Sequence, residues 1–209
     1  RVKGLKGVTK REGRTASNGL VTAVAGDGVG TLVEVLCETD FVAKGERFGA
    51  LAQQVLDQAV ATEAADAEAL LSSTLGDGKT VQELVGEANA SIGEKIEIKR
   101  VARVVAPTVV AYLHKTSPDL PAQIGVLFGS EGGDEATGRD VAMHIAAFAP
   151  TVLTRDEIDP AVVEHERKVA EETAKEEGKP EAALPKIIEG RVNGFFKESV
   201  LLEQAFAKD

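Results

Sequence analysis

The stretch TLVEVLCETDFVAKGE, residues 31–46, holds the signals that decide the fold. Side chains in its first half alternate between the two faces of a predicted strand, which places Val33, Val35 and Cys37 together on one face. The strand then runs into Thr-Asp-Phe. Phe41 is one of only seven phenylalanines in 209 residues, in a chain with one tyrosine and no tryptophan. A large aromatic side chain at a strand exit therefore requires an explanation.

Upstream, residues 20–37 read LVTAVAGDGVGTLVEVLC, two alternating stretches around a Gly-Asp-Gly turn. This pattern predicts a β-hairpin. Gly26, Gly28 and Gly30 also suggest part of a dinucleotide-binding fingerprint. A strand follows them, whereas a pyrophosphate site needs the N-terminus of a helix, so we assign the glycines to the hairpin turn.

Downstream, GERFGALAQQVLDQAVAT at 45–62 has apolar residues at the i, i+3, i+4 spacing of an amphipathic helix. The stripe predicted to face the core consists of Phe48, Leu51, Ala52, Val55, Leu56, Ala59 and Val60. A short acidic helix is expected around 66–73 and another at 80–90.

Three more strands are predicted in the middle of the chain. In EKIEIKRVARVV at 94–105, alternation puts four apolar residues on one face, interrupted by Arg100. These residues are Ile96, Ile98, Ala102 and Val104. TVVAYLHK at 108–115 and QIGVLFG at 123–129 are the other two, and the short loops favour antiparallel pairing. A helical pattern returns at 134–149, so the predicted fold class is α+β.

The last third of the chain predicts an antiparallel helical hairpin. One helix starts near Pro160 and runs to the Gly-Lys-Pro at 178–180, and EAALPKIIEGRVNGFFKESVLL at 181–202 returns. The predicted seam consists of Val162, Val169, Leu184, Ile188 and Phe195. Because this seam is thin and the outer faces are charged, we expect the hairpin to protrude.

Composition narrows the range of partners. The net charge of −10 and pI near 4.9 argue against a nucleic-acid or anionic-membrane binder, since both partners need a positive field. Residues 1–14 carry six Lys or Arg against one Glu, which leaves −15 for the remainder. We interpret this basic stretch as a solvated linker.

The absence of membrane-helix and signal-peptide patterns in the sequence predicts a cytoplasmic protein. No apolar run approaches the ~18 residues of a membrane helix, and the start lacks a signal-peptide pattern. The single cysteine, Cys37, excludes an internal disulfide and is expected to be a small buried apolar residue. The chain starts without Met and ends at AKD after the apolar LLEQAFA, so we expect a fragment of a longer protein.

Each candidate motif for catalysis or metal binding lacks a required residue or spacing. GDGKT at 76–80 ends like a phosphate-binding loop, but Ser73 stands where the first glycine belongs and no strand precedes it. Thr80 with Glu83 instead predicts a capping box. The three histidines lack metal-ligand spacing, and no nucleophile and base pair is legible. We therefore expect no enzyme activity, no metal and no cofactor.

The residues alone leave the role of the Thr-Asp-Phe turn open. In one interpretation Thr39 or Asp40 caps a helix and Phe41 folds back into the core. In the other, ETDFVAK at 38–44 resembles the signature of the elongation factor Ts family. Four further segments resemble that family in order. They are SIGEKIEIKRVA (91–102), YLHK and IGVLF (112–128), DVAMHIAAFAP (140–150) and KPEAALPKIIEGRVNGFFKE (179–198).

The resemblance implies a domain plan. Family members have an α+β core of two related subdomains with small antiparallel sheets packed against helices, and a helical hairpin inserted in the second. Carried onto this sequence, residues 1–18 are a basic linker and 19–105 the first subdomain. Residues 106–155 with 199–209 are an incomplete second subdomain, and 156–198 are the inserted coiled-coil hairpin.

The resemblance also implies a function: guanine-nucleotide exchange on elongation factor Tu in the cytoplasm during protein biosynthesis. In the family the Asp-Phe pair, here Asp40 and Phe41, enters the partner's nucleotide-binding domain near its magnesium site. The expected partner-binding residues are Thr39, Asp40, Phe41, Val42, Ile92, Gly93 and His114. Gly93 could instead simply end a helix, and His114 could be an ordinary edge-strand residue.

The sequence leaves two other function classes open. A nucleotide-binding enzyme would use GDGKT. A dimeric scaffold without exchange activity would use the helical hairpin as its main interaction surface.

Overall fold

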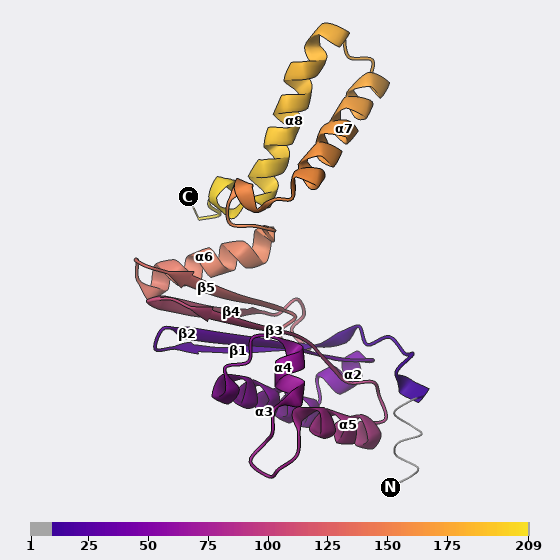
Figure 1. Ribbon diagram of the computed structural model, residues 1–209, viewed down its shortest axis with the longest axis vertical. Helices are drawn as coiled ribbons and strands as arrows, with labels where there is room; N and C mark the ends of the chain where they lie inside the picture. The colour runs from indigo at the N-terminus through magenta and orange to yellow at the C-terminus, as the bar shows by residue number, and fades with distance from the viewer. Residues whose placement is uncertain (1–9, 209) are drawn as a thin grey trace. The chain divides into compact units, whose positions relative to one another are not determined.

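The computed structural model describes residues 10–208 (Figure 1), and the predicted basic linker 1–18 lies partly outside them. The fold is α+β, with a three-stranded and a two-stranded antiparallel sheet among the described residues, which confirms the predicted class. The chain divides into two compact units, the first ending at Ala146 and the second beginning at Ala147.

The predicted β-hairpin is confirmed. Strand β1 (Asn18–Gly26) pairs with β2 (Val29–Cys37), and Gly26 stands opposite Val29. Asp27 and Gly28 fill the two-residue turn with φ of 52° and 77°, the left-handed pair that matches the twist of the flanking strands.

Four helices follow and cover one face of the three-stranded sheet (Figure 1). They are α2 (Asp40–Ala43), α3 (Glu46–Thr62), α4 (Ala67–Ser72) and α5 (Val81–Ile92). The apolar stripe of α3 is buried as predicted, except for Val60, which is 43% exposed. Together with Val33, Val35 and Cys37 of β2, it forms the main apolar core.

Strand β3 (Glu97–Val105) pairs with β2 and corrects one prediction. Glu34 faces Arg100 and Val35 faces Ile98, so Lys99 is an extra residue that forms a β-bulge. The bulge shifts the alternation by one position, and Val101 joins Ile96 and Ile98 on the main core.

Ala102 and Val104, predicted on that same face, are therefore on the other one. A Cβ added at Gly129 would meet the Val104 side chain at 2.8 Å, which places Val104 against the second sheet.

The second sheet consists of β4 (Thr108–His114) and β5 (Ile124–Ser130) and packs on the opposite face of the first (Figure 1). Glycines allow the close approach: a Cβ at Gly125 would lie 2.6 Å from the side chain of Leu32. Helix α6 (Glu135–Phe148) covers the outer face of this sheet, where Gly138 meets Val110. The first unit thus has four layers: helices, sheet, sheet and helix.

The second unit contains the predicted helical hairpin. Its helices are α7 (Pro160–Glu176) and α8 (Leu184–Ser199), with short 3-10 turns η1 (Arg155–Glu157), η2 (Glu181–Ala183) and η3 (Leu201–Glu203). A parallel bridge between Val152 and Val200 joins the two ends of the unit.

The hairpin seam differs from the prediction in α7. Val162 and Val169 are 43% and 42% exposed, and the buried residues of α7 are Ala170 and Ala174. Small alanines let the two helices approach closely, so the seam lies one position further along the helix. Leu184 is buried as expected. Among the described residues, no helix combines the length and the apolar character needed to cross a membrane.

Candidate partner-binding site

The Thr-Asp-Phe turn presents its aromatic side chain to solvent. The hydroxyl of Thr39 caps α2 by accepting a hydrogen bond from the Val42 amide at 3.3 Å. Asp40 opens the first turn of the helix. Phe41 is 76% exposed, the largest exposed fraction among the large apolar residues of the described chain. The capping part of the first interpretation is therefore confirmed, and the part in which Phe41 folds into the core is wrong.

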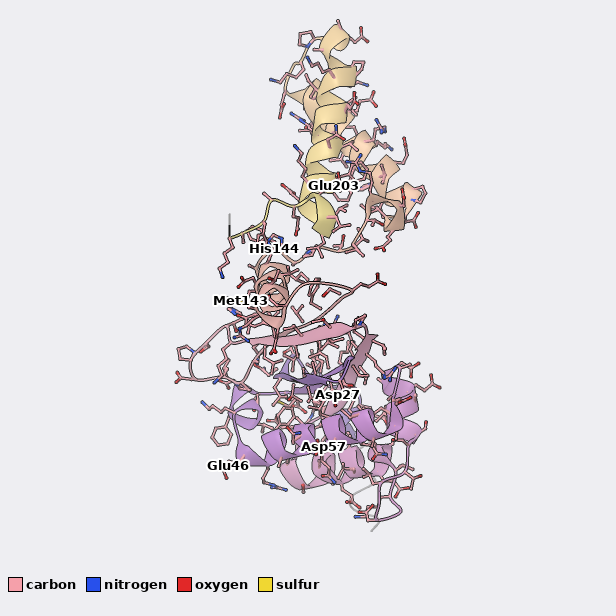
Figure 2. All side chains as sticks on the ribbon, turned by 90° about the vertical axis from the view of Figure 1, so that its left-hand side faces the viewer. Asp27, Glu46, Asp57, Met143, His144 and Glu203 are labelled. Atoms are coloured by element: carbon pink, nitrogen blue, oxygen red, sulfur yellow. The ribbon has the colours of Figure 1, made fainter. Side chains whose placement is uncertain are left out.

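Around Phe41 the turn is anchored by its neighbours. Ala43 is 3% exposed within the main core, and Val42 packs against that core. Helix α3 then begins at Glu46, which Figure 2 labels at the start of that helix. The sequence folds this way because apolar residues flank the aromatic on the core side, while Asp40 and Phe41 fall on the outer side of a single helical turn.

The second predicted contact, Ile92-Gly93, is the C-terminal end of α5. Gly93 adopts a left-handed conformation (φ 84°), and its amide donates to the Asn89 carbonyl at 3.0 Å. The helix-ending role considered for Gly93 is therefore real. Ile92 is half-buried against the main core, so only part of its side chain is available to a partner.

Hydrogen bonds hold these two turns together. One carboxylate oxygen of Glu94 accepts from the amides of Glu38 and Thr39 at 3.0 and 3.1 Å. The other accepts from the Thr39 hydroxyl at 2.7 Å. In return, a carboxylate oxygen of Glu38 accepts from the Lys95 amide at 2.6 Å. Sequence reasoning missed these roles, although Glu38 and Glu94 stand within the segments that carry the family resemblance.

The electrostatics of the turn follow from these contacts. The Lys95 amide, and then Arg14 at 3.4 Å, hold the pKa of Glu38 below its ordinary value of 4.5. Burial raises the pKa of the neighbouring Cys37 thiol to about 11, and the thiol donates to the Thr39 carbonyl. Cys37 is fully buried, as predicted, and its raised pKa makes it a poor nucleophile.

His114 is on a different element from these two turns. It ends β4 in the other sheet, is exposed, and its ring Nδ1 lies 3.0 Å from the Tyr112 hydroxyl of the same strand. The structure thus places six of the seven predicted site residues on two turns linked by hydrogen bonds, and His114 on β4.

The GDGKT segment at 76–80 and Thr80 make local contacts that support the fold. In the GDGKT segment the Leu75 amide donates to the Lys79 carbonyl at 2.7 Å, and the Lys79 ammonium lies 3.0 Å from Glu87. Thr80 caps α5 through the Glu83 amide at 3.1 Å, which confirms that half of the predicted capping box.

Acidic groups are dispersed over the first unit. Asp27 lies at the β1–β2 turn and Asp57 on α3, as labelled in Figure 2. In the part of the chain that the structure describes, no group of three or more histidine, cysteine or carboxylate side chains is arranged to hold a metal ion.

The fold and the site define an α+β protein that presents an exposed aromatic turn from a rigid frame and carries a helical hairpin in a second unit. Comparison with known proteins identifies this class. The family described as "Elongation factor TS" matches residues 38–209, and the chain belongs to that family.

Three relatives, each called elongation factor Ts, are similar over the whole of this chain and 75–76% of their own length. The protein of Kineococcus radiotolerans is 61% identical over 209 residues. That of Acidothermus cellulolyticus is 58% identical over 209, and that of Micrococcus luteus 55% over 212.

Proposed function

We propose that this chain acts in translation elongation by binding elongation factor Tu and promoting the release of its bound GDP, so that GTP can bind in its place. Family membership supports the elongation role. The observation that carries the exchange mechanism is the 76% exposure of Phe41 on a turn whose backbone is held by hydrogen bonds. A projecting aromatic on a rigid support is suited to enter a crevice in a partner.

In this mechanism Asp40 and Phe41 form a wedge that enters the nucleotide-binding domain of elongation factor Tu near its Mg²⁺ and phosphate site. Bound GDP is held there by backbone N–H groups, a lysine and Mg²⁺. A wedge that displaces this cluster loosens the nucleotide without any covalent step. The chain then acts as an exchange factor and not as an enzyme.

Thermodynamic linkage sets the size of the effect that the contact surface must supply. An exchange factor binds the nucleotide-free partner better than the nucleotide-bound one, and the nucleotide weakens factor binding by the same ratio. A ~10⁴-fold shift requires about 5.5 kcal/mol of differential binding. Burying one Phe side chain contributes about 1.5–3 kcal/mol. Phe41 therefore acts together with other contacts.

We assign those further contacts to Thr39, Val42, the Ile92-Gly93 turn and His114. Ile92 and Gly93 contribute shape beside the wedge, because one is half-buried and the other has no side chain. His114 adds an exposed polar group on a different element. The boundaries predicted for the linker, the two subdomains and the inserted hairpin stay part of this proposal, as does the cytoplasm as the site of action.

The test is the release of labelled GDP from purified elongation factor Tu after this chain is added. We expect release to accelerate with factor concentration and to saturate. A direct titration of the chain alone with labelled GDP or GTP is expected to show no binding, which separates exchange from the nucleotide-binding enzyme. An unchanged GDP release rate at saturating chain would contradict the proposal.

The dimeric scaffold remains the alternative, and sedimentation of the isolated chain addresses it. A stable dimer that dissociates when residues 156–198 are removed, in a chain that leaves GDP release unchanged, would favour the scaffold.

A further inference from the structure

We infer that Glu94 and Glu38 are positioning residues that brace the Asp40-Phe41 turn against the Ile92-Gly93 turn and so present both to a partner as one preorganised surface. This inference rests on the proposed exchange function for its consequence, and on four hydrogen bonds for its geometry. These four bonds between residues 38–39 and 94–95 form a brace.

The brace is reciprocal. Glu94 lies just beyond α5 and takes three donors from the two residues just after β2: two backbone amides on one oxygen and the Thr39 hydroxyl on the other. Glu38, the residue after β2, accepts from the Lys95 amide just beyond α5. Because each segment supplies a carboxylate to backbone groups of the other, the two turns cannot move apart without losing all four bonds.

The Thr39 hydroxyl connects the brace to the wedge. Its single proton is donated to Glu94, which leaves its lone pairs free to accept the Val42 amide at the start of α2. The cap of the helix that carries Phe41 is thus oriented by Glu94. Loss of the Glu94 carboxylate would free this hydroxyl to rotate and leave the Glu38 and Thr39 amides without their partner.

The brace also reaches the segment before β1. The Lys95 ammonium donates to the carbonyls of Glu12 and Arg14 at 2.9 and 3.2 Å, and Arg14 lies 3.4 Å from Glu38. Three segments that are far apart in the sequence therefore meet at the base of the exposed turn.

External support is needed because α2 is too short to support itself. A helix of four residues closes a single turn of hydrogen bonds, and helices well beyond that length are marginal in water. Its exposed aromatic has little core contact to fix it. A mobile wedge would have to be ordered on binding, which reduces the affinity it contributes, whereas a braced wedge is already in place.

The experiment compares Glu94→Ala with Glu94→Gln and with Glu87→Ala as the matched control. Glu87 is an exposed glutamate of α5 whose partner is Lys79. Amide hydrogen exchange measured by NMR on the chain alone reports the brace. The rate of labelled GDP release from elongation factor Tu reports its consequence.

We expect Glu94→Ala to speed exchange of the Glu38 and Thr39 amides at least tenfold while the amides shared by β1 and β2 keep their protection. GDP release should fall at least fivefold at subsaturating factor. Adding Phe41→Ala to this variant should cost less than twofold more, because the wedge is already misplaced. Glu94→Gln keeps an oxygen acceptor for both amides and should stay within threefold of the parent, as should Glu87→Ala.

Unchanged protection of the two amides in Glu94→Ala would overturn the brace. So would a variant that loses cooperative unfolding, because Glu94 would then hold the core rather than the turn. Thr39→Val, which removes the hydroxyl bond to Glu94 together with the cap on the Val42 amide, provides a second test: GDP release at the parent rate would overturn the connection to the wedge. A parent chain that fails to release GDP would overturn the proposed function, and amide exchange would still decide the brace.

Discussion

Replacing Phe41 by alanine separates the role of this side chain in folding from its role in binding. A core phenylalanine costs about 3–5 kcal/mol when truncated to alanine. Phe41 is 76% exposed, so only about a quarter of its surface is covered by the chain itself. A quarter of the roughly 1.5–3 kcal/mol for full burial is less than about 0.8 kcal/mol. We therefore expect the free energy of unfolding to change by less than ~1 kcal/mol.

The same exposed surface sets the expected loss of exchange activity. If a partner buries the remaining three quarters of the side chain, the contact contributes about 1–2 kcal/mol. This corresponds to roughly a 5- to 30-fold decrease in GDP release at subsaturating factor, since every ~1.4 kcal/mol is tenfold. Asp40→Ala should also slow release with the fold intact. The double variant should be less than additive, because both side chains enter one crevice.

The assay is stopped-flow release of fluorescent GDP from elongation factor Tu over a range of factor concentrations, with urea unfolding of each variant in parallel. Phe148→Ala is the matched control, because it removes a 54% exposed phenylalanine from the end of α6. We expect the control to retain the parent rate. An unfolding loss of several kcal/mol in Phe41→Ala, together with a parent rate for the folded fraction, would refute the argument.

Three further predictions concern the frame of the turn and the second unit. Cys37, fully buried and with its pKa raised to about 11, should react with iodoacetamide at pH 8 roughly 100-fold more slowly than free cysteine until denaturant is added. The pKa of Glu38 is lowered in the folded chain, so its ionised carboxylate stabilises the fold above the pKa of the unfolded chain, and this stabilisation is lost as the pH falls. The parent should therefore have a higher unfolding midpoint than Glu38→Gln at neutral pH, and the difference should shrink below about pH 4.5. Replacing 156–198 by a short Gly/Ser linker should leave one cooperative calorimetric transition, because the main core lies entirely between Leu20 and Val101; a broad, non-cooperative trace would contradict this.

Local patterns predicted the elements of the first unit well. The β1–β2 hairpin follows from strict alternation and a Gly-Asp-Gly turn, and both signals lie within 18 residues. The buried stripe of α3 follows from helical periodicity in the same way. Such signals are strong because the side chains concerned are neighbours in sequence as well as in space.

Register and packing partners were less predictable. The β-bulge at Lys99 is exposed, and its position depends on how β3 fits against β2, so no local signal marks it. The seam of the hairpin was misplaced because large valines were favoured over small alanines. Ala170 and Ala174 are buried because close helix packing favours small residues there, a property of the helix pair that one helix does not display.

The site also combines features that local sequence predicts with features that depend on long-range contacts. The resemblance pointed to Asp40 and Phe41, but the residues alone left the direction of Phe41 open. In the inferred brace, the turn that carries Phe41 is held by Glu94, which lies 55 residues from Thr39 along the chain. A carboxylate that accepts backbone amides leaves no spacing pattern in a single sequence, since its partners carry no characteristic side chain.

The brace bears on how a modest contact energy drives exchange. Contacts made equally well with nucleotide-bound and nucleotide-free partner raise affinity for both states and displace no GDP. Of the ~5.5 kcal/mol that a 10⁴-fold shift requires, the wedge supplies about 1–2. A mobile turn would move aside when the crevice is closed by nucleotide, and its energy would then be nearly equal in the two states. A turn held by Glu94 and Glu38 cannot retreat, so it clashes with the closed state and is buried in the open one. In the proposed mechanism, the rigidity of the frame therefore makes the binding energy of Phe41 differential.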